Sequence, residues 1–251
     1  MYKTMLLDIS GVLYQGNAPI AGSAQAIQRL RRAGVALRFV TNTSRQPASV
    51  LVQKLRDMGF EVALEELFTA PQAARRWLLE RGHRPYLIIH PDIEAEFNDL
   101  DQSNPDAVLL ADAEARLNYA YLDKAFALLM DGAPLLAIGD NRYFQGDDRL
   151  HLDAGPFVRA LEYAAGIQAQ VAGKPSSLFF EQALADAGGV ASKTLMVGDD
   201  VKADVQGALD AGLHACLVRT GKYRPGDEEA VRGRAMVEAS LETLVDVLVP
   251  S

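Results

Sequence analysis

Cysteine is almost absent from this sequence, since Cys216 is the only one among 251 residues. A single cysteine excludes an internal disulfide framework and is typical of proteins in a reducing cytoplasm. Long apolar runs are absent too: no stretch approaches the roughly eighteen residues of a membrane span, and Asp8 interrupts the first residues before a secretory signal is complete. We therefore expect a cytoplasmic protein that is neither secreted nor inserted in a membrane.

Basic residues are also scarce. The chain has 25 Lys and Arg against 33 Asp and Glu, which gives a formal net charge of −8. This balance argues against nucleic acid or an anionic membrane as partner, because both call for basic stripes. Of the four histidines, His90 and His151 have no second histidine or cysteine at ligand spacing, so we expect no zinc site.

What the sequence does contain is an alternation of short apolar strands with amphipathic helices. This pattern predicts an α/β, doubly wound, parallel-sheet fold of the Rossmann-like type. The two ends of the chain, residues 1–74 and 171–251, are expected to share one sheet. Strands are predicted at 5–8, 35–41, 194–198 and 215–218, and helices at 23–33, 47–58, 178–187 and 205–211.

The middle of the chain, residues 75–170, has strands and helices of its own and predicts a smaller inserted α/β domain. Strands are expected at 86–90, 107–110 and 135–138, and a helix at 119–130. Trp77, Phe126 and Tyr163 lie on apolar helical faces, and we predict that all three are core residues. Residues 139–143, with Arg142, form a candidate specificity loop, although an exposed surface arginine is the simpler interpretation of Arg142.

Polar residues stand at the ends of several predicted strands. Asp8 closes the first strand, Thr41 and Asn42 the second, and Asp199 follows a later one with Asp204 close behind. Ligands of open parallel sheets gather at the carboxyl ends of strands, so these side chains are expected to converge. Clustered carboxylates beside an apolar strand are unfavourable without a cation, and oxygen ligands suit Mg²⁺.

This arrangement predicts phosphoryl transfer. With Mg²⁺ held by the carboxylates of Asp8 and Asp199 and by the Ser10 carbonyl oxygen, and with Asp204 acting through water, Asp8 can attack phosphorus and form an aspartyl-phosphate. Thr41, Asn42 and Lys174 would donate hydrogen bonds to the equatorial phosphate oxygens. Each of these residues alone has a plainer interpretation as a turn, cap or surface residue, so their order in the chain carries the inference.

In that order the chain resembles the haloacid dehalogenase (HAD) superfamily, subfamily IIA, with an aspartate motif, a Ser/Thr motif, a lysine motif and a paired acidic motif. The resemblance implies a catalytic core with an inserted C2-type cap domain, a homodimer, and a small phosphorylated substrate or a phosphorylated protein side chain as partner. It implies these site residues: catalytic Asp8, Ser10 and Lys174; substrate-binding Asp8, Ile9, Ser10, Thr41, Asn42 and Lys174; magnesium-binding Asp8, Ser10, Asp199 and Asp204.

Ser10 departs from the superfamily, which usually has a second aspartate there as general acid and base. The departure is shared by the relatives the chain most resembles, phosphatases of pyrophosphate and P–N phosphoramidates. A serine hydroxyl is a poor acid near neutral pH, whereas a positioned carboxyl contributes on the order of 10²–10⁴-fold. We therefore expect substrates whose leaving groups need little acid assistance: pyrophosphate, phosphohistidine or phospholysine, with small phosphate esters as a further possibility.

Two other functions are compatible with the residues. One is a phosphate- or phosphoprotein-binding regulatory protein whose catalysis is weakened by Ser10. The other is a dehalogenase that uses Asp8 on carbon. The acidic pair Asp199 and Asp204 favours a magnesium enzyme over the dehalogenase, because displacement of halide from carbon does not need a metal to shield phosphate.

Overall fold

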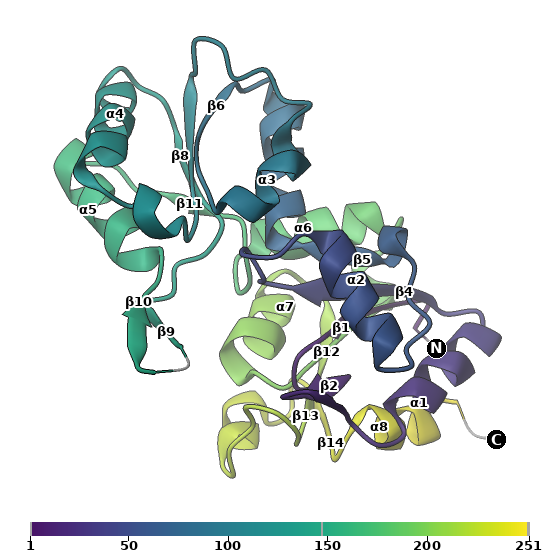
Figure 1. Ribbon diagram of the computed structural model, residues 1–251. Helices are drawn as coiled ribbons and strands as arrows, with labels where there is room; N and C mark the ends of the chain where they lie inside the picture. Colours follow the sequence, from purple (N-terminus) through teal and green to yellow (C-terminus); the bar gives the residue numbers. More distant parts are fainter. Residues whose placement is uncertain (1, 147, 250–251) are drawn as a thin grey trace. The chain divides into compact units, whose positions relative to one another are not determined.

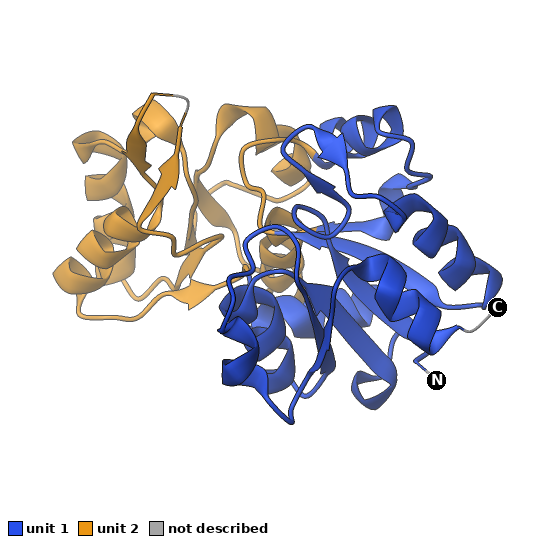
Figure 2. Ribbon diagram, turned by 90° about the horizontal axis from the view of Figure 1, so that it is seen from below, with its two compact units in different colours: residues 1–41, 48–68, 174–251 blue, residues 42–47, 69–173 orange. Residues whose placement is uncertain are grey.

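A computed structural model describes residues 2–146 and 148–249, and its contacts divide the chain into two compact units (Figure 2). Unit 1 contains the residues up to Thr41, Ala48–Phe68, and the residues from Lys174 onward. Unit 2 contains Asn42–Pro47 and Thr69–Gly173. The division between the units therefore falls at Phe68 and Gly173, compared with the predicted boundaries at residues 74 and 170.

Unit 1 is built on a six-stranded sheet in the order β14-β13-β12-β1-β4-β5 (Figure 1). The four neighbouring pairs from β14 to β4 are all parallel. Every residue of β1 and β12 is buried, as expected for central strands covered on both faces. The strands are β1 (Thr4–Asp8), β4 (Ala36–Thr41), β5 (Leu67–Thr69), β12 (Thr194–Gly198), β13 (His214–Val218) and β14 (Met236–Glu238).

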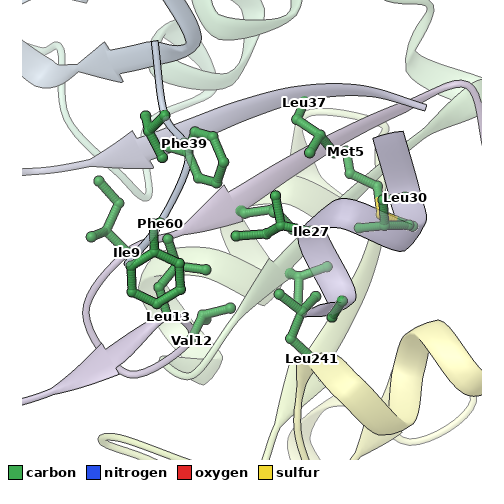
Figure 3. Close-up of a cluster of buried hydrophobic side chains, with 14 of the residues drawn as sticks. Met5, Ile9, Val12, Leu13, Ile27, Leu30, Leu37, Phe39, Phe60 and Leu241 are labelled. Carbon is green, nitrogen blue, oxygen red and sulfur yellow. The ribbon is translucent and has the colours of Figure 1, made fainter. Parts of the chain in front are cut away.

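One face of this sheet is covered by three helices whose apolar stripes share a single hydrophobic cluster. Figure 3 shows Ile27 and Leu30 beside Met5, with Leu241 in the same cluster. The three helices are α1 (Ser23–Arg32), α2 (Ala48–Asp57) and α8 (Leu241–Leu248). The other regular elements of unit 1 are β2 (Tyr14–Gln15), β3 (Ala18–Pro19), α6 (Ser177–Asp186), a π-helical turn (Val201–Gln206), α7 (Gly207–Asp210), and 3₁₀ turns at Leu64–Glu66, Ala191–Lys193 and Asp227–Val231.

Unit 2 has a parallel sheet of its own in the order β11-β8-β7-β6. Its separate hydrophobic cluster includes Val108, Leu110 and Val158. The elements are α3 (Ala70–Arg81), β6 (Pro85–Ile88), β7 (Ala107–Leu110), α4 (Tyr119–Met130), β8 (Leu135–Ala137), the hairpin β9 (Tyr143–Gln145) and β10 (Leu150–Leu152), α5 (Gly155–Ala165), β11 (Gln170–Val171), and 3₁₀ turns at Pro91–Phe97 and Glu114–Arg116.

The doubly wound parallel-sheet prediction is confirmed, but two details were wrong. Tyr163 is 93% exposed rather than in the core, because α5 buries Val158 and Leu161 and Tyr163 lies on the opposite side of the helix. The helix predicted at 205–211 is instead a π-helical turn from Val201 followed by the short α7. Trp77 is buried as predicted, and Phe126 is partly buried against the core of unit 2.

Cys216 is buried in β13, in agreement with the predicted strand. Over residues 2–146 and 148–249, none of the helices combines the length and the apolar character needed to cross a bilayer.

Candidate active site

The two central strands, β1 and β12, mark the point where the chain winds in opposite directions across the sheet of unit 1. From β1 the chain continues through α1 to β4, and from β12 it continues through α7 to β13. Because crossovers between parallel strands are right-handed, these two helices lie on opposite faces of the sheet. The carboxyl ends of β1 and β12 therefore form a topological switch point, where open α/β sheets bind their ligands.

Three carboxylates meet at this switch point. Asp8 ends β1, Asp199 directly follows β12, and Asp204 lies on the π-helical turn. All three are buried, and each offers a ligand atom within 4.8 Å of the others. Three carboxylates this close together repel one another strongly, so the cluster needs positive charge.

Lys174 supplies part of that charge. Its ammonium group donates hydrogen bonds to Asp8 Oδ1 at 2.5 Å and to Asp204 Oδ1 at 2.6 Å. The other oxygen of Asp204 accepts a hydrogen bond from the Asp200 backbone N–H at 3.1 Å. Lys174 thus joins the nucleophile candidate on β1 to the acid on the π-helical turn.

Asp199 is held differently from the other two acids. Its Oδ2 atom accepts a hydrogen bond from the Lys222 backbone N–H at 2.6 Å. Its Oδ1 atom is buried and has no hydrogen-bond partner among the described residues. A buried carboxylate oxygen without a partner costs free energy unless something binds it, which makes this atom a candidate ligand for a cation.

The protonation states follow from burial and from the neighbouring charges. Burial raises the pKa of Asp8 from 3.8 to about 7, against the Lys174 ammonium, which lowers it. Burial also raises the pKa of Asp199. For Lys174 burial acts in the lowering direction, but Asp204 and Asp8 outweigh it and raise the pKa above the ordinary 10.5, so this lysine stays charged. The donor set, three carboxylates with one unpartnered oxygen, fits a hard divalent cation such as Mg²⁺.

The remaining predicted residues occupy different surroundings. Ser10 is exposed and pairs through its backbone with Tyr14. The Ile9 side chain is buried in the hydrophobic cluster of unit 1 (Figure 3), so only its backbone can face a substrate. Thr41 is buried at the end of β4, and Asn42 is the next residue and the first of unit 2.

Several residues around the acids were not among those predicted from the sequence. Lys222 contributes its backbone N–H to Asp199 and its ammonium to Asp200, at 3.3 Å. Asp200 also caps the π-helical turn, since its Oδ1 atom accepts hydrogen bonds from the N–H groups of Lys202 and Ala203. A backbone donor has no residue signature, so sequence alone could not identify the first contact.

Comparison with known proteins gives consistent matches over both ends of the chain. Residues 5–103 match the family model of haloacid dehalogenase-like hydrolases, and residues 171–244 match a HAD-hydrolase-like family. The chain is 44% identical over 254 residues to a Rattus norvegicus protein named phospholysine phosphohistidine inorganic pyrophosphate phosphatase, covering 98% of this chain and 94% of that protein.

Solved structures give the same result. The 4-nitrophenylphosphatase from Thermotoga maritima superposes with a TM-score of 0.85 at 28% identity, covering 98% of this chain and 97% of that one. The glycerol phosphate phosphatase from Mycobacterium tuberculosis, in complex with magnesium, superposes with a TM-score of 0.83 at 25% identity, covering 97% and 76%. With these matches and the acids gathered at its switch point, the chain belongs to the haloacid dehalogenase-like hydrolases.

Proposed function

We propose that this protein is a magnesium-dependent phosphatase that works through an aspartyl-phosphate on Asp8. The observation that carries the proposal is the buried cluster of Asp8, Asp199 and Asp204, with Lys174 bonded to two of its members. Close relatives that are named as phosphatases of phospholysine, phosphohistidine and pyrophosphate support the same reaction class.

In this proposal an oxygen of the Asp8 carboxylate attacks phosphorus. A phosphorus–oxygen bond forms, and the bond from phosphorus to the leaving atom breaks with its electron pair remaining on that atom. Water then attacks the aspartyl-phosphate, which releases inorganic phosphate and restores Asp8. Over the two steps one water is consumed, and the leaving group takes up one of its protons.

The chain's own residues each have a defined part. Lys174 opposes the effect of burial on the pKa of Asp8 and orients its carboxylate. With Thr41, Asn42 and the backbone of Ile9 and Ser10, it would bind the phosphate oxygens. Asp8, Asp199 and the Ser10 carbonyl oxygen would hold Mg²⁺, with Asp204 acting through water. Bound Mg²⁺ would offset the repulsion between the carboxylate nucleophile and phosphate.

Ser10 narrows the substrate class. Phosphate leaves pyrophosphate with little need of a proton from the enzyme, and the nitrogen of a phosphoramidate can be protonated from solvent. We therefore propose pyrophosphate, phosphohistidine and phospholysine as substrates ahead of small phosphate esters. We also propose, from the resemblance, that unit 1 is the catalytic core and unit 2 its C2-type cap, and that the protein is a cytoplasmic homodimer.

The test is phosphate release from pyrophosphate, imidodiphosphate and an aryl phosphate, each with Mg²⁺ and with EDTA. We expect release that depends on Mg²⁺ and is lost in Asp8→Asn, with Asp210→Asn on α7 as the matched control. Absence of release from every substrate would favour a phosphate-binding regulatory protein instead.

A second variant tests the interpretation of Ser10. Restoring the carboxyl in Ser10→Asp supplies a general acid, so turnover of a simple alkyl phosphate should rise by roughly 10- to 100-fold, a part of the usual general-acid contribution. Turnover of pyrophosphate should rise less. Equal gains on the two substrates, or no gain on either, would remove the argument that Ser10 selects the leaving group.

A further inference from the structure

The carboxylate of Asp199 lies between two loops that are far apart in the sequence. One is the loop after β1, which contains Gly11, and the other is the loop after β13, which contains Thr220, Gly221 and Lys222. The Thr220 hydroxyl donates a hydrogen bond to the Gly11 carbonyl oxygen, so the loops are joined directly.

At Gly11 and Gly221 there is no room for a side chain beside Asp199. A Cβ atom on Gly221 would lie 2.0 Å from Asp199 Oδ2 and 2.5 Å from Gly11 Cα. A Cβ atom on Gly11 would lie 2.0 Å from the same carboxylate oxygen. Both glycines also have positive φ angles, +61° for Gly221 and +91° for Gly11, which other residues rarely adopt.

This close fit gives the two oxygens of Asp199 different roles. The Lys222 N–H occupies Oδ2, and the Lys222 ammonium anchors the same residue to Asp200 at 3.3 Å. The Oδ1 atom of Asp199 stays buried and has no hydrogen-bond partner among the described residues. Asp199 also belongs to the acid cluster with Asp8 and Asp204. The Lys222 contact fixes the orientation of the carboxylate, so that one oxygen is held by the loop and the other stays available.

We infer that the segment Thr220-Gly221-Lys222 is a positioning element for the metal ligand Asp199. It holds one carboxylate oxygen through a backbone amide and keeps the other available for a divalent cation. The inference rests on the proposed magnesium site and adds to it residues that hold the ligand Asp199 in position. Positioning contacts of this kind usually change metal affinity by 10- to 100-fold when they are removed.

The experiment is titration of purified, EDTA-treated protein with Mg²⁺ alone, followed by calorimetry, together with thermal unfolding. Gly221→Ala should weaken Mg²⁺ binding by roughly 10- to 100-fold. The matched control is Gly233→Ala, because Gly233 also has a positive φ, +74°, but a Cβ atom there meets nothing within 4 Å. Both alanines carry the same kind of backbone strain, but only the one at Gly221 also overlaps Asp199 and Gly11. We therefore expect a larger loss of thermal stability in Gly221→Ala than in Gly233→Ala, and a loss of Mg²⁺ affinity in Gly221→Ala alone.

A second pair of variants avoids the glycine backbone. Thr220→Val removes the hydroxyl that bonds Gly11, and Thr220→Ser retains it. We expect weaker Mg²⁺ binding in Thr220→Val and recovery in Thr220→Ser. The inference would be overturned if Gly221→Ala and Thr220→Val both kept the wild-type Mg²⁺ affinity. It would also be overturned if Gly221→Ala and Gly233→Ala lost the same amount of Mg²⁺ affinity. Failure of the unsubstituted protein to bind Mg²⁺ would overturn the proposed metal site itself, and the positioning role with it.

Discussion

At the residue scale, Lys174 determines whether a buried cluster of acids can exist in the folded protein. Its ammonium group is almost inaccessible to solvent and bonds two carboxylates, those of Asp8 and Asp204. A buried ion pair adds little stability compared with apolar residues in place of all its members. Removing only one partner, however, leaves an unpaired buried charge. The lysine is therefore a structural requirement of the site as well as a candidate phosphate ligand.

Lys174→Met should accordingly lower the free energy of unfolding of the metal-free protein by about 3 kcal/mol at pH 8. The loss should be smaller at pH 5, because protonation of Asp8, whose pKa burial raises, relieves part of the buried charge. Denaturant unfolding at the two pH values measures both effects. Lys202→Met, at an exposed lysine on the π-helical turn, is the control and should change stability by less than about 0.5 kcal/mol. A Lys174→Met protein as stable as the control at pH 8 would contradict this account.

The raised pKa of Asp8 predicts a pH dependence of metal binding. Below its pKa of about 7 the carboxyl holds a proton that a cation must displace, so Mg²⁺ affinity falls as pH falls. Between pH 8 and pH 5 the apparent affinity should drop by roughly 100-fold, since each pH unit below the pKa is about tenfold. Calorimetric titrations at the two pH values test this, and an unchanged affinity at pH 5 would count against Asp8 as a ligand.

The same shift affects the stability of the metal-free protein in the opposite sense from an ordinary surface aspartate. Unfolded Asp8 ionises near pH 3.8, whereas folded Asp8 keeps its proton up to about pH 7. The folded state therefore binds more protons over this window, and the Asp8 contribution to stability declines as pH rises from about 4 to about 7. Added Mg²⁺ should raise the Tm more at pH 8 than at pH 5.

At the scale of elements, the π-helical turn Val201–Gln206 is the piece of secondary structure that delivers Asp204 to the cluster. Asp200 begins it by accepting hydrogen bonds from two backbone N–H groups of its first turn. A cap of this kind typically contributes about 1 kcal/mol. Asp200 and Asp204 are four residues apart, so the start of the turn sets the position of the Asp204 carboxylate.

Asp200→Ala should lower stability by about 1 kcal/mol and weaken Mg²⁺ binding, because the turn that carries Asp204 loses its cap. Asp200→Asn retains a capping oxygen and should recover most of the stability, although it loses the charge that pairs with Lys222. Thermal unfolding and Mg²⁺ titration of the two variants separate the cap from the charge. Equal stability of the alanine and asparagine variants would rule out the capping role.

The elements also show which features a sequence reveals. The strand ends carrying Asp8 and Asp199 were predictable, because apolar runs followed by acids have a clear pattern and a parallel sheet brings their carboxyl ends together. The contact between Lys222 and Asp199 was not predictable, because it is made by a backbone N–H group, which every residue except proline possesses. The π-helical turn was not predictable either, since its side-chain pattern does not differ from that of a helix starting a few residues later.

At the scale of the molecule, unit 2 has the properties of an independently folding domain. It has its own four-stranded parallel sheet and a hydrophobic cluster that includes Val108, Leu110 and Leu135. Most of it is one continuous segment, Thr69–Gly173. A separate core is what allows a domain to fold alone.

A fragment of residues 69–173 should therefore unfold cooperatively when expressed by itself. Its stability should be below that of the same unit in the whole chain, because the fragment lacks Arg45, which bonds the buried Asp112. Asp112→Asn in the fragment removes the charge left without a partner and should restore part of the stability. Circular dichroism during thermal denaturation measures both, and a fragment without a cooperative transition would refute the prediction.

The pairing of β1 with β12 has a consequence for how the protein is made. Thr4 pairs with Thr194, so partners in the centre of the sheet are 194 − 4 = 190 residues apart. The strand that ends in Asp8 is synthesised before β12. It can pair early with β4, but it acquires β12, and with it Asp199, Asp204 and the loop at Lys222, only after the intervening residues have left the ribosome. Contacts of such long range are slow to form. The acid cluster therefore assembles only after β12 and the π-helical turn have been made, so a nascent chain that carries Asp8 without Asp199 and Asp204 lacks the proposed metal site.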